Sequence, residues 1–315
     1  MAPMRWPSLI AHRGASGTHP EHTADAVLAG FALGADAVEP DLVPARDGTL
    51  VVRHEPEISG TTDVAAHPEF ADRQRTIRVP QEAQAPGDRL DELSGWFTFD
   101  FDWAELARLA ARERLPQLRP DSAGRAGEPL LRFIDLLELV RPLRTAADEP
   151  AVVVAELKHP SAFALLGYDL PARFLAELDG RFPVERVVVE CFELPALLRL
   201  RELGYSGRLV LLASESTDHT ALRAAGIDGV SYDKALLLQP DGVDLVADAR
   251  TAGLGVLTWT LRPENAFLAE RHRRPGGDGA WGDWRAEYAE VLDTGVDAVF
   301  ADHPDLVRAL LAERG

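Results

Sequence analysis

Two carboxylates spaced two positions apart, with histidines nearby in the sequence, are the residues of this chain best suited to chemistry. A short apolar run ends at His12, a second run carries Glu39 and Asp41, and a third ends at His54. Side chains of a β-strand alternate between its two faces, so Glu39 and Asp41 point the same way. Two carboxylates on one face repel each other unless a positive charge neutralises them, and a divalent cation is the most economical neutraliser.

A third carboxylate, Glu156, follows at the end of a later apolar run. If these runs are barrel strands, Glu39, Asp41 and Glu156 converge on one point above their carboxyl ends. Three oxygen donors, with further positions left to water and phosphate, suit one Ca²⁺ or Mg²⁺ better than Zn²⁺, which prefers His or Cys. An isolated Glu-x-Asp pair is more often a pair of solvated or salt-bridged acids. The third acid and the two histidines favour the cation site.

The charged and imidazole side chains next to these acids suit acid–base cleavage of an anionic substrate. Such a reaction takes a proton from an attacking hydroxyl or water and gives one to the leaving group, and the imidazoles of His12 and His54 can do either. Arg13 can bind phosphate through two nitrogens, whereas Lys158 supplies a point charge. The alternatives are a hydrogen-bonded structural role for each histidine and ion pairs with the acids for each cation.

Four further residues have weaker signals. Glu21 opens a predicted helix, where favourable interaction with the helix dipole competes with a role as ligand or orienting group. Glu190 and Arg262 are candidates for the mouth of the site by position only. Asp302 either orients Arg13 or closes the barrel.

Taken in order, the motifs of this chain resemble the signature of glycerophosphodiester phosphodiesterases. They are His12-Arg13-Gly14, Pro20-Glu21 with Thr23, Glu39-x-Asp41, His54, Glu156-Leu157-Lys158, Cys191-Phe192, Thr258-Trp259-Thr260 and Ala301-Asp302-His303-Pro304-Asp305. The resemblance covers nearly the whole chain. It departs from the family pattern at His22, Glu55 and Cys191, where Asn, Asp and Ser are usual. None of these departures removes a predicted ligand or catalytic histidine, so they bear on substrate detail more than on chemistry.

The resemblance implies metal-dependent hydrolysis of a small glycerophosphodiester to sn-glycerol 3-phosphate and an alcohol. It implies that Trp259 lines the glycerol side of the site. Direct attack by water and a cyclic phosphate formed by the glycerol 2-hydroxyl both stay open. The alternative functions are a lysophospholipase D-like or sphingolipid phosphodiesterase with the same chemistry, and a non-catalytic barrel that binds a phosphorylated ligand.

The elements that must position these residues alternate between short apolar runs and amphipathic stretches, which is typical of parallel βα units. The pattern predicts an α/β fold, a TIM-type (β/α)8 barrel. Its strands are expected to end at Arg13, Val43, Glu156, Cys191, Ala213, Tyr232, Thr260 and Asp302. Its helices are expected at 23–33, 162–178, 195–203, 220–225, 243–252, 286–293 and 304–313. Glycines at 34, 204, 226, 253 and 295 occupy the expected helix C-cap positions.

Two regions interrupt this alternation. Residues 55–129, after the second strand, lack a clear βα unit, and a long irregular loop of this kind is usually a lid or an insertion. We expect it to lie over the carboxyl-terminal face of a single domain spanning 1–315. Its aromatic run, 96–103, either packs in the core of the insertion or forms an apolar wall beside the leaving group. Residues 271–284 are predicted to form a second loop.

A hairpin is expected to bring His54 to the acids. Only twelve residues separate Asp41 from His54, too few for a parallel crossover, and Asp47-Gly48 is a strong signal for a two-residue turn. That turn would pair Arg46 with Thr49 and place Asp41 opposite His54.

Composition limits the partners. A net charge of −18 argues against nucleic acid or an anionic membrane surface as a partner. One cysteine cannot form an internal disulfide. Because neither a secretory signal nor a run of 18 apolar residues is present, we expect a cytoplasmic protein without stable membrane association. The sequence does not indicate an oligomeric state.

Overall fold

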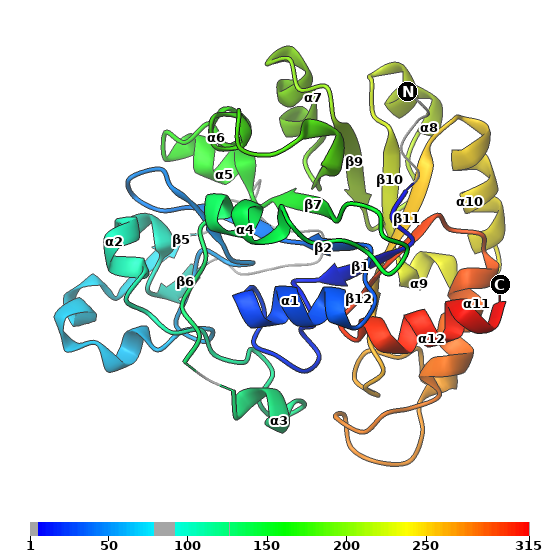
Figure 1. Ribbon diagram of the computed structural model, residues 1–315, viewed down its shortest axis with the longest axis horizontal. Helices are drawn as coiled ribbons and strands as arrows, with labels where there is room; N and C mark the ends of the chain where they lie inside the picture. The colour runs from blue at the N-terminus through cyan, green and yellow to red at the C-terminus, as the bar shows by residue number, and fades with distance from the viewer. Residues whose placement is uncertain (1–5, 79–91, 126, 315) are drawn as a thin grey trace.

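Eight parallel strands form a closed barrel in the computed structural model, which describes residues 6–78, 92–125 and 127–314 (Figure 1). The strands are β1 (Leu9–His12), β2 with its continuation β3 (Ala37–Glu39 and Asp41–Pro44), β7 (Val152–Leu157), β8 (Val187–Cys191), β9 (Arg208–Ala213), β10 (Gly229–Asp233), β11 (Gly255–Leu261) and β12 (Ala298–Ala301). Pairing of β1 with β12 and of β2 with β7 closes the ring. The predicted barrel is confirmed, and each strand ends within one residue of its predicted end.

Alternation along the strands separates two apolar layers. Ile10, Val154 and Val210 belong to a cluster inside the barrel, together with Phe300. Their neighbours in sequence, such as Val153, belong to a larger cluster that packs under the helices. The β-branched residues that dominate these strands suit such a doubly buried sheet.

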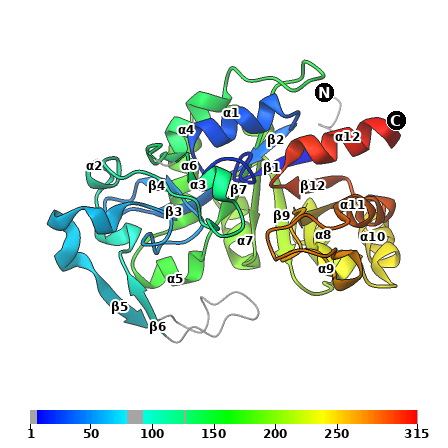
Figure 2. The ribbon, with the colours of Figure 1, turned by 90° about the horizontal axis from the view of Figure 1, so that it is seen from below.

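Helices surround the barrel (Figures 1 and 2). They are α1 (Ala24–Ala32), α4 (Phe133–Val140), α5 (Pro160–Leu165), α6 (Leu170–Leu178), α7 (Leu194–Glu202), α8 (His219–Ala224), α9 (Lys234–Leu237), α10 (Gly242–Thr251), α11 (Trp284–Asp293) and α12 (Pro304–Arg314). The five predicted C-cap glycines all have positive φ, between 83° and 95°. None of the described helices has the length and apolar character that crossing a bilayer requires.

One predicted helix, 162–178, is wrong, because the structure has two helices there. Helix α5 ends at Leu165, and Gly167 follows with a φ of 87°. Helix α6 then begins after Asp169, whose side chain accepts a hydrogen bond from the Ala172 N–H. The glycine and the N-cap aspartate interrupt a stretch whose apolar pattern alone is continuous.

The predicted hairpin is present, but its predicted register is wrong by one residue. Strand β3 pairs with β4 (Leu50–Val52) so that Leu42 faces Val52. The backbone N–H of Arg53 donates to the backbone carbonyl of Asp41. Asp41 is therefore opposite Arg53 and not opposite His54. The loop has three residues, 46–48, and ends in Gly48 with a φ of 81°. A three-residue loop of this kind favours a glycine in the left-handed region at its last position.

Residues 55–129 have a small core of their own. Their described elements are η1 (Val64–Ala66), η2 (Pro68–Arg73), β5 (Arg75–Arg78), β6 (Glu92–Gly95), η4 (Thr98–Asp100), α2 (Trp103–Leu106) and α3 (Pro120–Ala123). The run 96–103 is interrupted by η4 and is not one extended strand. Phe101 packs in this core with Val43 and Val51 of the hairpin. In both views β5, β6 and α2 lie at the end of the molecule opposite α10.

The second interruption, 271–284, is a loop as predicted, between η6 (Glu270–His272) and α11. Asn265 holds it through hydrogen bonds from its side-chain amide to the carbonyls of Arg274 and Gly277.

Candidate active site

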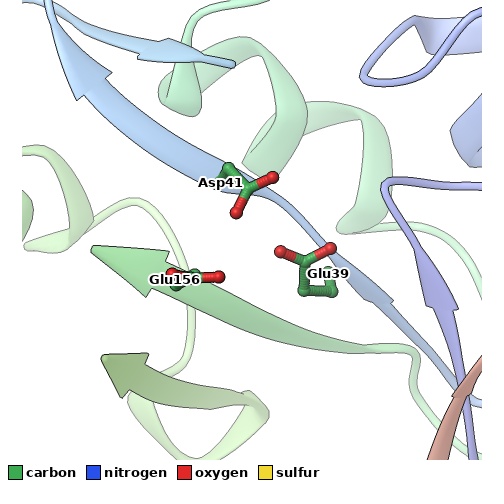
Figure 3. A group of neighbouring side chains, drawn as sticks. All are labelled: Glu39, Asp41 and Glu156. Atoms are coloured by element: carbon green, nitrogen blue, oxygen red, sulfur yellow. The ribbon is translucent and has the colours of Figure 1, made fainter. Parts of the chain in front are cut away.

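Three carboxylates from neighbouring strands converge at the carboxyl end of the barrel. Asp41 of β3 lies directly beside Glu156 of β7, and Glu39 lies two residues before Asp41 on the same face. Each of Glu39, Asp41 and Glu156 offers an oxygen within 4.8 Å of the others. Figure 3 shows the three side chains directed toward a common space. All three are buried.

The electrostatics of this group fit a cation. Burial and the neighbouring charge of Asp41 raise the pKa of Glu39 well above its usual range, and burial raises the pKa of Glu156 to about 7. Burial opposes ionisation of Asp41 as well, but Lys158 and other positive neighbours hold its pKa well below the usual range. Among the described residues, Oδ1 of Asp41 has no hydrogen-bond partner, although Nζ of Lys158 lies 3.3 Å away. These buried, mutually repelling oxygens are suitable ligands for Ca²⁺ or Mg²⁺.

Arg13 and Lys158 are paired with the acids and also line the cavity. Nζ of Lys158 donates to Glu156 at 2.8 Å. Nε of Arg13 lies 3.2 Å from Asp41, and its backbone N–H donates to the side chain of Glu39 at 2.9 Å. Arg13 and Lys158 therefore form the ion pairs that were the alternative to phosphate binding. They also line the cavity in which a phosphate would bind.

Each of the two histidines is held by a carboxylate. Nδ1 of His12 lies 2.6 Å from Asp302, and Nδ1 of His54 lies 2.5 Å from Glu55. An ionised carboxylate only accepts hydrogen bonds, so Nδ1 carries the proton and the neutral ring has an unprotonated Nε2. Burial, followed by the charge of Arg13, lowers the pKa of His12 to about 4 and that of His54 to about 3. Both rings are neutral at pH 7 in this structure.

These side chains share one cavity of about 420 Å³. Its lining includes His12, Arg13, Glu39, His54, Glu156, Lys158, Glu190, Phe192, Trp259 and Arg262. Trp259 meets Phe192 edge to face, with ring centroids 5.6 Å apart. This aromatic pair gives the cavity one apolar wall. None of the residues 96–103 is among those that line it.

The structure shows the contacts of four residues whose roles the sequence left open. His22 was noted as a departure, and its Nε2 lies 2.9 Å from Asp41. Asp302 binds His12 and not Arg13. Glu190 of β8 lies directly beside Glu156 of β7 and lines the cavity, and burial raises its pKa well above the usual range. Arg262 donates to Asp302 at 2.8 Å.

Two arginines of the 55–129 segment, Arg114 and Arg119, reach this site and were missed. Arg114 binds Glu21 and Glu55, and Arg119 binds Glu264 and Asp302. The segment is irregular and contains many arginines, so no periodic pattern distinguishes these two.

Comparisons with known proteins identify the family of this chain. The model of the "Glycerophosphoryl diester phosphodiesterase family" matches residues 12–306. A glycerophosphodiester phosphodiesterase of Arabidopsis thaliana is 28% identical over 340 aligned residues, which cover 94% of this chain and 83% of that protein.

Solved structures are similar in fold. A Silicibacter pomeroyi protein that carries the same family name superposes with a TM-score of 0.71 at 22% identity, covering 98% of this chain and 94% of its own. An Oleispira antarctica phosphodiesterase, solved in complex with the product sn-glycerol-3-phosphate, superposes with a TM-score of 0.65 at 19% identity and covers 97% of each chain.

Proposed function

Since the chain belongs to the glycerophosphoryl diester phosphodiesterase family, we propose that it hydrolyses glycerophosphodiesters to sn-glycerol 3-phosphate and an alcohol with the help of one divalent cation. The observation that supports this most directly is a pair of carboxylate-bound histidines, His12 and His54, which line one cavity with the buried acids Glu39 and Glu156. A site that only binds phosphate has no need of a proton-transfer pair, so these histidines favour the enzyme over the phospho-ligand-binding barrel.

Glu39, Asp41 and Glu156 would hold the cation, either Ca²⁺ or Mg²⁺. When bound, it would supply charge stabilisation at the phosphate and lower the pKa of an attacking hydroxyl or water. Arg13 and Lys158 would stabilise the charge that develops on the phosphoryl oxygens. Lys158 is paired with Glu156 in this structure, and its ammonium group would become available to the substrate if Glu156 served as a cation ligand.

The two histidines would divide the proton transfers between them. One takes a proton from the attacking oxygen at its unprotonated Nε2, and the other delivers a proton from Nε2 to the leaving alkoxide. The acid must first gain that proton, and the negative charge of a bound phosphodiester raises the pKa of a nearby imidazole and so favours its gain. Trp259 and Phe192 would contact the glycerol carbons.

We further propose that residues 1–315 act as one domain, with 55–129 covering the carboxyl-terminal face of the barrel. The contacts of Arg114 and Arg119 with residues at that face support this arrangement.

The test is an assay of glycerophosphocholine, glycerophosphoethanolamine and a lysophospholipid side by side. We expect turnover of the two glycerophosphodiesters, loss of turnover in excess chelator, and recovery on addition of Ca²⁺ or Mg²⁺. Full activity in excess chelator would contradict the cation. Preference for the lysophospholipid would mean that the protein is a lysophospholipase D-like enzyme. Binding of a phosphate ester without turnover of any diester would support the non-catalytic binding barrel.

A further inference from the structure

Two arginines of the 55–129 segment contact the carboxylates that hold the two histidines. Nη1 of Arg114 donates to Glu55 at 2.6 Å, and Glu55 accepts from His54. Nη2 of Arg119 donates to Asp302 at 2.6 Å, and Asp302 accepts from His12. The same order, arginine to carboxylate to imidazole, therefore occurs twice, and both arginines come from one short stretch outside the barrel strands.

Each arginine is fixed by a second contact at its other side. The guanidinium of Arg114 binds both oxygens of Glu21, with Nε donating at 2.9 Å and Nη2 at 2.5 Å. Nε of Arg119 donates to Glu264 at 2.7 Å, and its Nη1 donates to the carbonyl of Ser16 at 3.0 Å. A guanidinium that is also held by these further partners has little freedom to leave Glu55 or Asp302.

The stretch that carries the two arginines is itself braced. One oxygen of Glu113 accepts the backbone N–H of Leu115 at 2.8 Å, and the other accepts the hydroxyl of Ser122. Glu113 and Ser122 are both buried. The carboxylate of Glu113 thus links the backbone next to Arg114 to a side chain three residues after Arg119, which braces the stretch that carries both arginines.

The arginines act on the histidines through charge and orientation. Burial opposes ionisation of Asp302, but Arg262, Arg119 and the bond from His12 together hold its pKa well below the usual range. Burial likewise opposes ionisation of Glu55, and His54 together with Arg114 lowers its pKa. A carboxylate that stays ionised and fixed keeps the proton of its histidine on Nδ1 and so keeps Nε2 directed to the reaction.

We propose that Arg114 and Arg119 are positioning residues, which orient His54 and His12 for proton transfer through Glu55 and Asp302. The proposal rests on the acid and base roles proposed above for the two histidines. It assigns the 55–129 segment a part in the chemistry itself, at two points, in addition to covering the barrel face.

The first test is steady-state kinetics of Arg114→Gln and Arg119→Gln on glycerophosphocholine at saturating cation. Loss of groups that orient a catalytic residue lowers activity by on the order of 10- to 100-fold. We expect that loss in kcat, with KM and calorimetric cation affinity little changed. Arg112→Gln is the matched control, since Arg112 is an exposed arginine of the same stretch, and it should keep wild-type turnover.

A double-mutant cycle separates positioning from general structural support. If Arg119 acts only through His12, adding Arg119→Gln to His12→Ala costs no further activity, and the same holds for Arg114→Gln added to His54→Ala. Losses that multiply in both double variants overturn the proposal. So does wild-type kcat in either single arginine variant.

A substrate with an acidic leaving group provides an independent test of the two positioning roles. The p-nitrophenyl ester of glycerol 3-phosphate releases an anion that needs no proton, so the arginine that supports the acid loses its effect on this substrate while the other keeps it. Equal loss in both variants on both substrates contradicts the proposal. Where a Gln variant fails to fold, the Lys variant, which keeps the charge but not the fork, should show an intermediate kcat.

These outcomes are distinguishable from failure of the proposed function. If His12→Ala and His54→Ala keep wild-type turnover, the acid and base roles are wrong. If those two variants lose turnover while Arg114→Gln and Arg119→Gln do not, only the present inference is wrong.

Discussion

At the scale of single residues, the site combines low-pKa histidines with carboxylates of raised pKa in one cavity. We expect His12→Ala and His54→Ala each to lower kcat by on the order of 10²-fold or more, because each removes one proton transfer. Calorimetric cation affinity should change little, because neither histidine is among the proposed ligands. Turnover at the wild-type level in either variant would return that histidine to a structural role.

The depressed pKa of His12 also predicts how stability depends on pH. Its pKa is about 4 in the folded protein against 6.5 for the free side chain. Between these values the unfolded chain binds a proton at this histidine that the folded protein does not. The contribution of His12 to the free energy of unfolding is therefore fully present above pH 6.5 and is lost as pH falls toward 4.

This loss is measurable as the difference between two proteins. Urea unfolding at pH 7 and pH 4 in chelator should show wild type losing up to about 3 kcal/mol more than His12→Gln. The raised pKa values of Glu39 and Glu156 act in both proteins and cancel to first order. Identical pH dependence of the two proteins would contradict the burial of a neutral imidazole.

At the scale of elements, the β3–β4 hairpin brings the loop that holds His54 to the barrel mouth. Its loop ends in Gly48 with a φ of 81°, where a Cβ would also lie 2.7 Å from the guanidinium of Arg173. Gly48→Ala should lower the free energy of unfolding by about 1 kcal/mol, since an L side chain in this region costs that order of energy. Gly60→Ala, at a position with open space around it, is the control, and urea midpoints compare the two.

Sequence reasoning predicted elements well where periodicity and glycine punctuation agree. The barrel strands and the five C-cap glycines follow from local patterns, and so does the convergence of Glu39, Asp41 and Glu156 from strand alternation. The hairpin register could not be read, because Asp47-Gly48 fits both a two-residue and a three-residue loop. Arg114 and Arg119 could not be found either, because their partners are 59 to 183 residues away in the sequence.

At the scale of the whole molecule, a net charge of −18 opposes the approach of an anionic substrate. Positive side chains such as Arg13 and Lys158 are paired with acids within the site and offset this field only locally. Added inert salt screens the repulsion, with a screening length of about 10 Å at 0.1 M.

Salt should therefore increase activity on a charged substrate, in contrast to an enzyme whose surface attracts it. With the cation saturating, we expect kcat/KM for glycerophosphoglycerol, a net anion, to rise severalfold as ionic strength increases from about 10 to about 200 mM. Zwitterionic glycerophosphocholine is the control and should respond weakly. A fall in kcat/KM for the anion would show that local positive charge outweighs the net charge.

Labelling of the chain's one cysteine can measure transient opening of the barrel. Cys191 ends β8 beside Glu190, is 1% exposed, and donates from Sγ to the carbonyl of Leu157 at 3.2 Å. Burial raises the pKa of this thiol well above its usual range, so a thiol-specific chromogenic reagent reacts only when local opening of the structure around β8 exposes the thiol to solvent. The labelling rate should fall when Ca²⁺ or Mg²⁺ is added, in proportion to occupancy, because a cation that binds Glu39, Asp41 and Glu156 only in the closed barrel stabilises the closed form relative to the open one. Absorbance traces recorded on the unmodified protein over a series of ion concentrations would then give the affinity for each ion without substrate.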